Sequence, residues 1–216
     1  MFDTGNNNRF YCKSFTMEVS ILENKTMEKI FFSSFRLFLE NGYEATNIRD
    51  ICKDVGIKAS TLYFYYKSKE DLFFIIYDGI SMDYLNYFKG IETSISEISV
   101  EEKLFSLLKQ KIKYFALDIS KQKLILRYHL FPPKDLASKL REKYTYYTNE
   151  ENKIISKIIL NCKDNNLFLN ENINDNLIEY KRLENYLIYE MTVFGIKIND
   201  REFSKLWDVF WNNATK

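Results

Sequence analysis

The segment between Val55 and Lys69 combines positive charge, hydroxyl groups and aromatic rings in a pattern suited to binding a phosphate backbone. It contains no Asp or Glu, and Lys58, Lys67 and Lys69 supply its charge. The whole chain is nearly neutral, with 31 Lys and Arg against 30 Asp and Glu, so this basic character is local. Because cations on phosphates release condensed counterions and hydroxyls fix the register, the segment predicts contacts with double-stranded DNA. The alternative is a solvated charged loop beside a tyrosine-rich core.

The apolar spacing around this segment predicts a helix, a tight turn and a second short helix. We expect Thr46 to be the N-cap of the first of these helices, which has a single apolar stripe. Gly56 then supplies the turn, and a helix over 59–66 follows it. A short helix of this kind can enter the major groove and read base edges with its early side chains. An upstream helix, from Thr26 to a left-handed residue at Gly42, completes a three-helix domain.

The run from Thr46 to Leu72, TNIRDICKDVGIKASTLYFYYKSKEDL, resembles the signature of the TetR family of transcriptional regulators. The resemblance implies that the threonine at 46, the tyrosine at 63 and the lysine at 69 contact phosphate, with residues 58–61 at the N-terminal end of the recognition helix. Lys58 and Ser60 depart from the residues usual in the family, so no base preference is transferred. The predicted DNA-contacting residues are Thr46, Lys58, Ala59, Ser60, Thr61, Tyr63, Phe64, Lys67 and Lys69.

Turn-forming residues are scarce, with six glycines and two prolines in the chain, and apolar residues recur at spacings of three and four. This pattern predicts an all-α protein. We expect an extended or disordered tail over 1–25, the helix-turn-helix domain over 26–72, and a helical bundle for ligand binding and dimerisation over 73–216. Further helices are predicted over 69–89, 100–120, 121–130, 134–163, 176–198 and 200–213, with a solvated connection over 164–175.

The sequence lacks the patterns of several other chemistries. Its three cysteines, Cys12, Cys52 and Cys162, have neither disulfide nor zinc spacing, and His129 is the only histidine. There is no P-loop, G-x-S-x-G, H-E-x-x-H or dinucleotide glycine pattern, so we expect no enzymatic activity, no cofactor and no metal. Neither a signal-peptide pattern nor an apolar run of bilayer length occurs, which predicts a cytoplasmic protein without a membrane partner.

The resemblance also implies a pocket for a small molecule in the bundle. The dense Tyr and Phe content predicts an apolar or aromatic effector, although such stripes at helical spacing also form plain core. Glu190 lies among apolar residues, where a desolvated carboxylate attracts a cation unless it reaches the surface. The candidate lining residues are Tyr84, Phe88, Phe105, Leu108, Ile112, Arg127, Phe131, Tyr144, Tyr147, Glu190 and Phe194.

A homodimer built on the last two helices is the final implication of the resemblance. Trp207 and Trp211 suit an interface anchor, with an ordinary core helix as the alternative. A dimer would place two recognition helices about 34–36 Å apart, in successive major grooves of a pseudo-palindromic operator. The implied function is that of a ligand-released repressor; an activator, or a regulator whose bundle binds a protein, stays open. The predicted interface residues are Leu183, Leu187, Met191, Phe203, Leu206, Trp207, Phe210 and Trp211.

Overall fold

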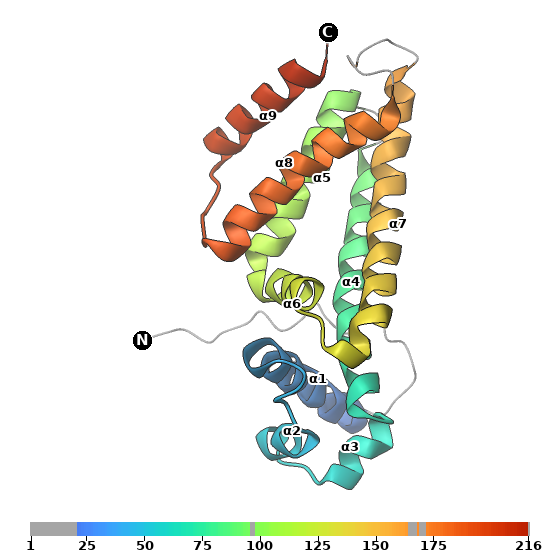
Figure 1. Cartoon of the computed structure of the whole chain (residues 1–216), viewed down its shortest axis with the longest axis vertical. Helices are drawn as coiled ribbons and strands as arrows, with labels where there is room; N and C mark the ends of the chain where they lie inside the picture. Colours follow the sequence, from blue (N-terminus) through green and yellow to red (C-terminus); the bar gives the residue numbers. More distant parts are fainter. Residues whose placement is uncertain (1–20, 96–97, 164–167, 169–171, 216) are drawn as a thin grey trace. The chain divides into compact units, whose positions relative to one another are not determined.

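The computed structural model describes residues 21–95, 98–163, 168 and 172–215 (Figure 1). The chain forms two compact units that divide between Asp83 and Tyr84, inside the helix α4 (Lys69–Ser94). Every regular element in the described ranges is a helix, which confirms the predicted all-α class. None of these helices is long and apolar enough to cross a bilayer.

The first unit contains α1 (Ile21–Asn41), α2 (Ile48–Val55), α3 (Ala59–Tyr65) and the beginning of α4. Each helix contributes a fully buried apolar side chain to one core, and the four are Phe38, Ile51, Leu62 and Phe73. The rings of Phe38 and Phe73 meet edge to face with centroids 5.3 Å apart. Because the apolar first turns of α4 belong to this core, the first unit extends beyond the boundary predicted at residue 72.

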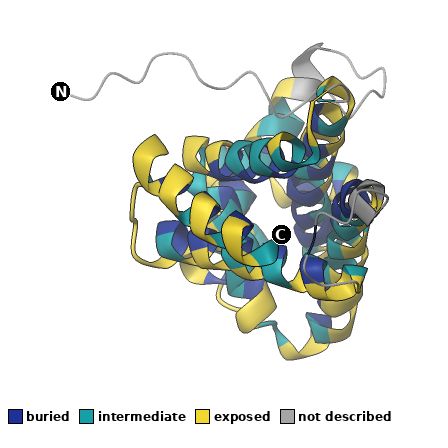
Figure 2. Cartoon of the chain, turned by 90° about the horizontal axis from the view of Figure 1, so that it is seen from above, coloured by how far each residue is buried: buried dark blue, intermediate teal, exposed yellow. Residues whose placement is uncertain are grey.

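The second unit contains the rest of α4 and the remaining helices. α7 packs against both α5 and α8, and α8 also packs against α9. Buried residues lie on the helix faces that meet their neighbours, with exposed residues on the outer faces (Figure 2). The bounds are Val100–Leu117 for α5, Ile119–Leu130 for α6, Lys134–Leu136 for the 3-10 turn η1, Ala137–Lys163 for α7, Ile173–Val193 for α8 and Asp200–Ala214 for α9.

Several helix boundaries differ from the predictions for local reasons. α1 begins at Ile21 and not at Thr26, and the rest of the predicted tail, residues 1–20, lies outside the described residues. The Asn172 side chain accepts a hydrogen bond from the Asn174 amide at 3.0 Å, so α8 begins before the predicted residue 176. α8 also ends before the predicted residue 198, because Gly195 takes the left-handed conformation at φ 67°. Most of the predicted connection over 164–175 lies outside the described residues.

Candidate functional site

The recognition helix α3 is anchored on one face and open on the other. Leu62 is fully buried at 0% exposure, whereas Tyr63 and Phe64 are 53% and 75% exposed. Ser60 is exposed as well, and the spacing from 60 to 63 and 64 places these three side chains on one side of α3. Lys67 is also exposed and follows the end of the helix, after the extended backbone of Tyr66. Three of the predicted DNA-contacting residues therefore share one exposed side of α3, and a fourth, Lys67, is exposed just after the helix.

Lys58 is the residue that precedes α3, and its backbone is extended at φ −81° and ψ 152°. Its carbonyl accepts the Thr61 amide at 3.0 Å, but a lysine side chain has no acceptor with which to cap the helix. Lys58 and Ala59 are exposed, and Thr61 is half-buried. Their positions leave the N-terminal side chains of α3 available for contacts outside the chain.

The turn between α2 and α3 depends on the conformation of Gly56. Gly56 has φ 75°, a left-handed conformation that glycine adopts without strain. A Cβ there would meet nothing within 4 Å, so the backbone angle, and not the available space, favours glycine. The Ile57 amide closes the turn by donating to the Cys52 carbonyl at 2.9 Å. Cys52 is buried, and burial raises the pKa of its thiol, as expected for an unreactive structural cysteine.

A polar network fixes α2 against α1 and thereby positions α3. The Ser33 hydroxyl donates to Asp54 at 2.6 Å, and the Arg36 guanidinium pairs with the same carboxylate at 2.9 Å. The hydrogen bonds from Ser33 and Arg36 lower the pKa of Asp54. An open groove of about 650 Å³ runs along these residues, and none of the predicted DNA-contacting residues lines it.

Thr46 and Lys69 turn toward the protein interior. Thr46 is buried, and its hydroxyl donates to the Gly42 carbonyl at 2.7 Å. The N-cap of α2 is Asn47, whose amide donates to the Asp50 carboxylate at 3.2 Å, so the prediction of Thr46 as the cap was wrong. The Thr46 hydroxyl is bonded to the carbonyl of Gly42 after α1 and is not available to cap α2. The Lys69 ammonium donates to the carbonyls of Tyr43 and Thr46 at 3.0 and 3.2 Å.

Lys69 therefore ties α4 to the loop between α1 and α2. We expect Lys69→Ala to lower the free energy of unfolding of the first unit by about 1–3 kcal/mol, because it leaves two carbonyls without their donor. Lys67→Ala, which removes an exposed ammonium, is the matched control and is expected to change stability by no more than about 0.5 kcal/mol. Hydrogen–deuterium exchange of the α1–α3 amides measures both variants. Equal stability of the two variants would contradict the conclusion that Lys69 holds α4 against the loop between α1 and α2.

The predicted effector-binding residues do not all face the interior of the second unit. Phe88, Leu108 and Ile112 are buried, whereas Phe131 and Phe194, also predicted to line the pocket, are 77% and 62% exposed and lie at the surface of the chain. Each lies just past a helix end, where the chain leaves the packed faces. The partly buried candidates are Tyr84, Phe105, Arg127, Tyr144, Tyr147 and Glu190.

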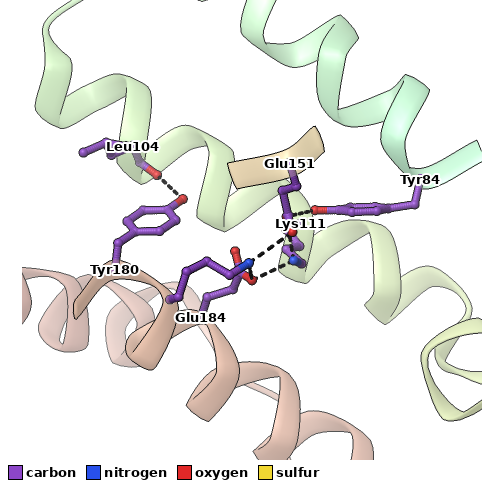
Figure 3. Close-up of polar contacts among 7 residues, drawn as sticks. Tyr84, Leu104, Lys111, Glu151, Tyr180 and Glu184 are labelled. Carbon is purple, nitrogen blue, oxygen red and sulfur yellow. Dashed lines mark hydrogen bonds and ion pairs between the residues drawn. The ribbon is translucent and has the colours of Figure 1, made fainter. Parts of the chain in front are cut away.

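A buried ring of four charges, not predicted from the sequence, joins α5, α7 and α8. Lys111 pairs with Glu151 at 2.6 Å and with Glu184 at 2.7 Å. Lys181 pairs with Glu151 at 3.0 Å and also with Glu184, which closes the ring. Tyr84 of α4 donates its hydroxyl to Glu151, and Figure 3 shows these side chains converging from separate helices.

The sequence does contain a signal for this charged ring. Lys111 continues the inward stripe of Leu104 and Leu108, where an apolar residue is expected. Glu184 similarly falls between the buried positions Tyr180 and Ile188 of α8. A charge at a core register requires a buried partner, so such interruptions predict an ion pair. The predicted carboxylate, Glu190, is only half-buried, and the fully desolvated ones are Glu151 and Glu184.

The ring also shifts the acidity of its members. Burial alone would raise the pKa of Glu151, but Lys111, Lys181 and the Tyr84 hydroxyl overcome burial and lower it to about 2. Burial would likewise lower the pKa of Lys181, yet Glu184 and Glu151 raise it above its usual range. Both groups are therefore held in their charged forms at neutral pH.

This acidity predicts a specific loss of stability in acid. The pKa of Glu151 is lowered in the folded state, so the ionised carboxylate stabilises the fold. This stabilisation is complete above about pH 4.5 and is lost as the pH falls toward about 2. We expect the free energy of unfolding of the second unit to decrease across this range. The fluorescence of Trp207 and Trp211 reports on this unit during unfolding in urea. The variant Lys111→Met/Glu151→Met should have a shallower pH dependence, and an unchanged dependence would contradict the assignment.

Most residues predicted for the dimer interface are committed to the core of their own chain. Trp207 and Trp211 stack with centroids 5.7 Å apart and are 3% and 8% exposed. These rings fill the space between α5, α8 and α9, so little of their surface is available to a partner, and their role as interface anchors stays a prediction. Leu187, Met191 and Phe203 are buried in the same core, and Leu183, Leu206 and Phe210 are partly buried against it.

A different set of apolar side chains is exposed on α8. Ile178, Tyr186, Tyr189 and Val193 are each 47–49% exposed. Offsets of 8, 11 and 15 residues from Ile178 place all four on one side of the helix. The described residues of the chain cover only about half of this apolar stripe of α8.

Comparison with known proteins agrees with this architecture. Residues 32–75 match the family described as bacterial regulatory proteins, tetR family. The chain is 37% identical over 76 residues to the HTH-type transcriptional regulator YerO of Bacillus subtilis (strain 168), covering 34% of this chain and 25% of YerO. It is 41% identical over 46 residues to IcaR, a negative regulator of the biofilm operon icaADBC in Staphylococcus epidermidis, covering 21% of this chain and 25% of IcaR. The chain thus spans about a quarter of the length of these relatives.

The likeness to solved structures covers both units. The transcriptional regulator FadR of Bacillus subtilis, solved in complex with stearoyl-CoA, superposes with a TM-score of 0.65 at 17% identity. That match covers 87% of this chain and 99% of the FadR chain, and it shows a shared fold. The matched helix-turn-helix segment contains the exposed α3 and its glycine turn. Residues 32–75 thus carry the tetR-family segment, and the chain as a whole shares the fold of solved regulators described as members of the TetR family.

Proposed function

We propose that this regulator is a dimeric repressor that binds a pseudo-palindromic operator through α3 and releases it when a small molecule binds the second unit. The exposed face of α3 is the observation that carries the proposal. Ser60 and Tyr63 project from a helix whose opposite face is anchored by Leu62, and Lys67 is exposed just after the end of that helix. Hydroxyl and ammonium groups on such a helix can contact both phosphates and base edges.

Two similar proteins support the proposal of repression and of a bound effector. IcaR is a negative regulator of the operon that it controls. FadR of Bacillus subtilis has the same fold and was solved with stearoyl-CoA bound. We therefore infer repression for this chain, together with an effector held in the second unit. α4 is shared by both units, so a change in the position of α4 within the second unit provides a route from effector to DNA.

The effector must distinguish two states of the dimer. It can shift the equilibrium only by its difference in affinity for the DNA-binding state and the released state, so tight binding alone does not cause release. The exposed stripe Ile178, Tyr186, Tyr189 and Val193 is the surface we assign to the dimer contact, in place of the buried tryptophans. Association through this stripe would cover side chains that water otherwise contacts.

Substitutions on α3 test the proposal through two different responses. We expect Tyr63→Phe, which removes a predicted phosphate contact, to weaken binding to all DNA sequences by a similar factor. We expect Ser60→Ala, at a predicted base contact, to change the preferred sequence, with an effect of about 1–3 kcal/mol at the affected base pair. Gel-shift titration against the DNA upstream of the protein's own gene, and against single-base variants of the bound site, measures both.

Leu130→Ala serves as a control, because this exposed side chain lies at the end of α6 in the second unit. It should leave both the affinity and the sequence preference unchanged. If Tyr63→Phe and Ser60→Ala altered binding in the same way, α3 would not be the reading element. If the unaltered protein showed no sequence preference at moderate salt, the proposal that it binds a specific operator would be wrong.

A further inference from the structure

We infer that Glu184 is the hydrogen-bonding anchor of the effector site, and that it selects an uncharged aromatic or apolar molecule bearing a hydroxyl or amide N–H donor. This inference rests on the proposed function, and it specifies the class of effector. Glu184 is 2% exposed and lies in the charged ring of the second unit. Figure 3 shows it extending from α8 toward Lys111.

The two oxygens of Glu184 differ in their partners. Oε1 accepts from Lys111 at 2.7 Å and also from Lys181. Oε2 is buried, and no described residue donates a hydrogen bond to it. A buried carboxylate oxygen without a donor costs free energy, so this atom favours a molecule that brings one. Among the described residues of the ring, Glu184 Oε2 is thus the atom that an incoming donor can satisfy.

The balance of charge in the ring decides what kind of donor fits. Lys111 and Lys181 supply two positive charges, and Glu151 and Glu184 supply two negative charges, so the ring is neutral. An ammonium group on the ligand would add an uncompensated positive charge in a desolvated place, which is costly. A carboxylate or phosphate would add a negative charge and would offer no donor. A neutral hydroxyl or amide N–H supplies the donor and keeps the ring neutral.

The side chains beside the ring indicate the rest of the molecule. The Tyr84 ring lies with its centroid 5.0 Å from that of Phe115, 5.4 Å from Tyr114 and 5.7 Å from Phe88. The Lys111 ammonium is 5.1 Å from the centroid of the Tyr84 ring, so the aromatic group and the charged ring adjoin. Aromatic surfaces of this kind favour a flat apolar body by offset or edge contacts. A phenol has both the body and the donor.

Tyr84 also connects the anchor to α4. Its hydroxyl donates to Glu151, which shares both lysines with Glu184. A donor that binds Glu184 alters the shared ion pairs, and Glu151 and Tyr84 respond through the same network. Tyr84 is thus a positioning residue, and the link gives the effector a path to α4.

Isothermal titration calorimetry of the full chain with three probes of similar shape tests the inference. 4-Ethylphenol carries a neutral donor, 4-ethyltoluene replaces the hydroxyl with a methyl group, and 4-ethylbenzylamine carries a cation at neutral pH. We expect 4-ethylphenol to bind about tenfold or more tightly than either of the others. Equal affinity for the phenol and the toluene, stronger binding of the amine, or no binding of the phenol would each overturn the inference. The last result would mean that water alone satisfies Glu184 Oε2.

Two matched double variants locate the preference in Glu184. Lys111→Met/Glu184→Met removes the anchor and leaves the neutral pair Lys181 and Glu151. Lys111→Met/Glu151→Met keeps the anchor and leaves the neutral pair Lys181 and Glu184. We expect the preference for 4-ethylphenol over 4-ethyltoluene to disappear in the first variant and to persist in the second. The opposite pattern, or equal loss in both folded variants, would reject Glu184 as the anchor.

Operator binding by the unaltered protein separates this inference from the proposed function. Sequence-specific DNA binding without a preference for the phenol would support the proposed DNA-binding function and reject the inferred class of effector. Absence of sequence-specific binding would overturn the proposed function, whatever the calorimetry showed.

Discussion

Lys111→Met is expected to lower the free energy of unfolding of the second unit by about 3–5 kcal/mol. Lys111 is buried, and its ammonium contacts Glu151 at 2.6 Å and Glu184 at 2.7 Å. Methionine preserves much of the unbranched side chain but leaves the ring with one positive and two negative charges. An uncompensated buried charge costs far more than a lost surface ion pair, which is typically worth about 1 kcal/mol or less.

The double variant Lys111→Met/Glu184→Met is the control for this effect. It removes one charge of each sign, and the remaining Lys181 and Glu151 still pair at 3.0 Å. Replacing a buried ion pair with apolar groups is often close to neutral, so most of the lost stability should return. Tryptophan fluorescence during urea unfolding measures both variants, since Trp207 and Trp211 are the only tryptophans and both lie in this unit. A double variant as unstable as the single one would show that the cost comes from packing and not from charge.

Leu62→Ala is expected to destabilise the first unit by about 2–5 kcal/mol and to abolish specific DNA binding. Leu62 is at 0% exposure and is the apolar residue by which α3 joins the core. A seven-residue helix such as α3 has little stability of its own, so it depends on this contact. Hydrogen–deuterium exchange should show early loss of protection in α2 and α3, while the tryptophans of the second unit keep their unfolding midpoint.

Phe64→Ala is the matched control for Leu62→Ala. It truncates a large side chain of the same helix, but one that is 75% exposed. We expect its effect on stability to be within about 0.5 kcal/mol. If both substitutions destabilised the unit equally, the assignment of the inner and outer faces of α3 would be incorrect.

The first unit could be predicted from sequence because its local rules agree with one another. Gly42 and Gly56 stand where left-handed residues end helices, and both have positive φ, at 86° and 75°. The start of α4 also has a local capping contact, since the Asp71 amide donates to the Ser68 hydroxyl at 3.0 Å. Thr46 was misplaced because both Thr46 and Asn47 are good N-caps, and the choice depends on the hydrogen bonds that the Thr46 hydroxyl donates to the carbonyls of Leu37 and Gly42 at the end of α1.

The second unit was predicted less well because its chemistry depends on contacts between distant helices. Lys111 and Glu184 are 73 residues apart, and nothing local pairs them. Spacing identifies an apolar stripe but does not say whether the stripe meets the same chain or another copy. For that reason Trp207 and Trp211 were assigned to an interface although they pack inside. The exposed Tyr186 and Tyr189 were missed for the same reason.

Selection of bound sequences from a pool of randomised duplexes tests the central claim most directly, because it asks whether the exposed face of α3 reads DNA as part of a symmetric pair. We predict enrichment of two inverted half-sites whose centres lie about one helical turn, or a small multiple of it, apart. Ser60→Ala should change the enriched bases within each half-site while keeping the spacing. Enrichment of no sequence at moderate salt, or of the same bases by the unaltered protein and the variant, would contradict the account.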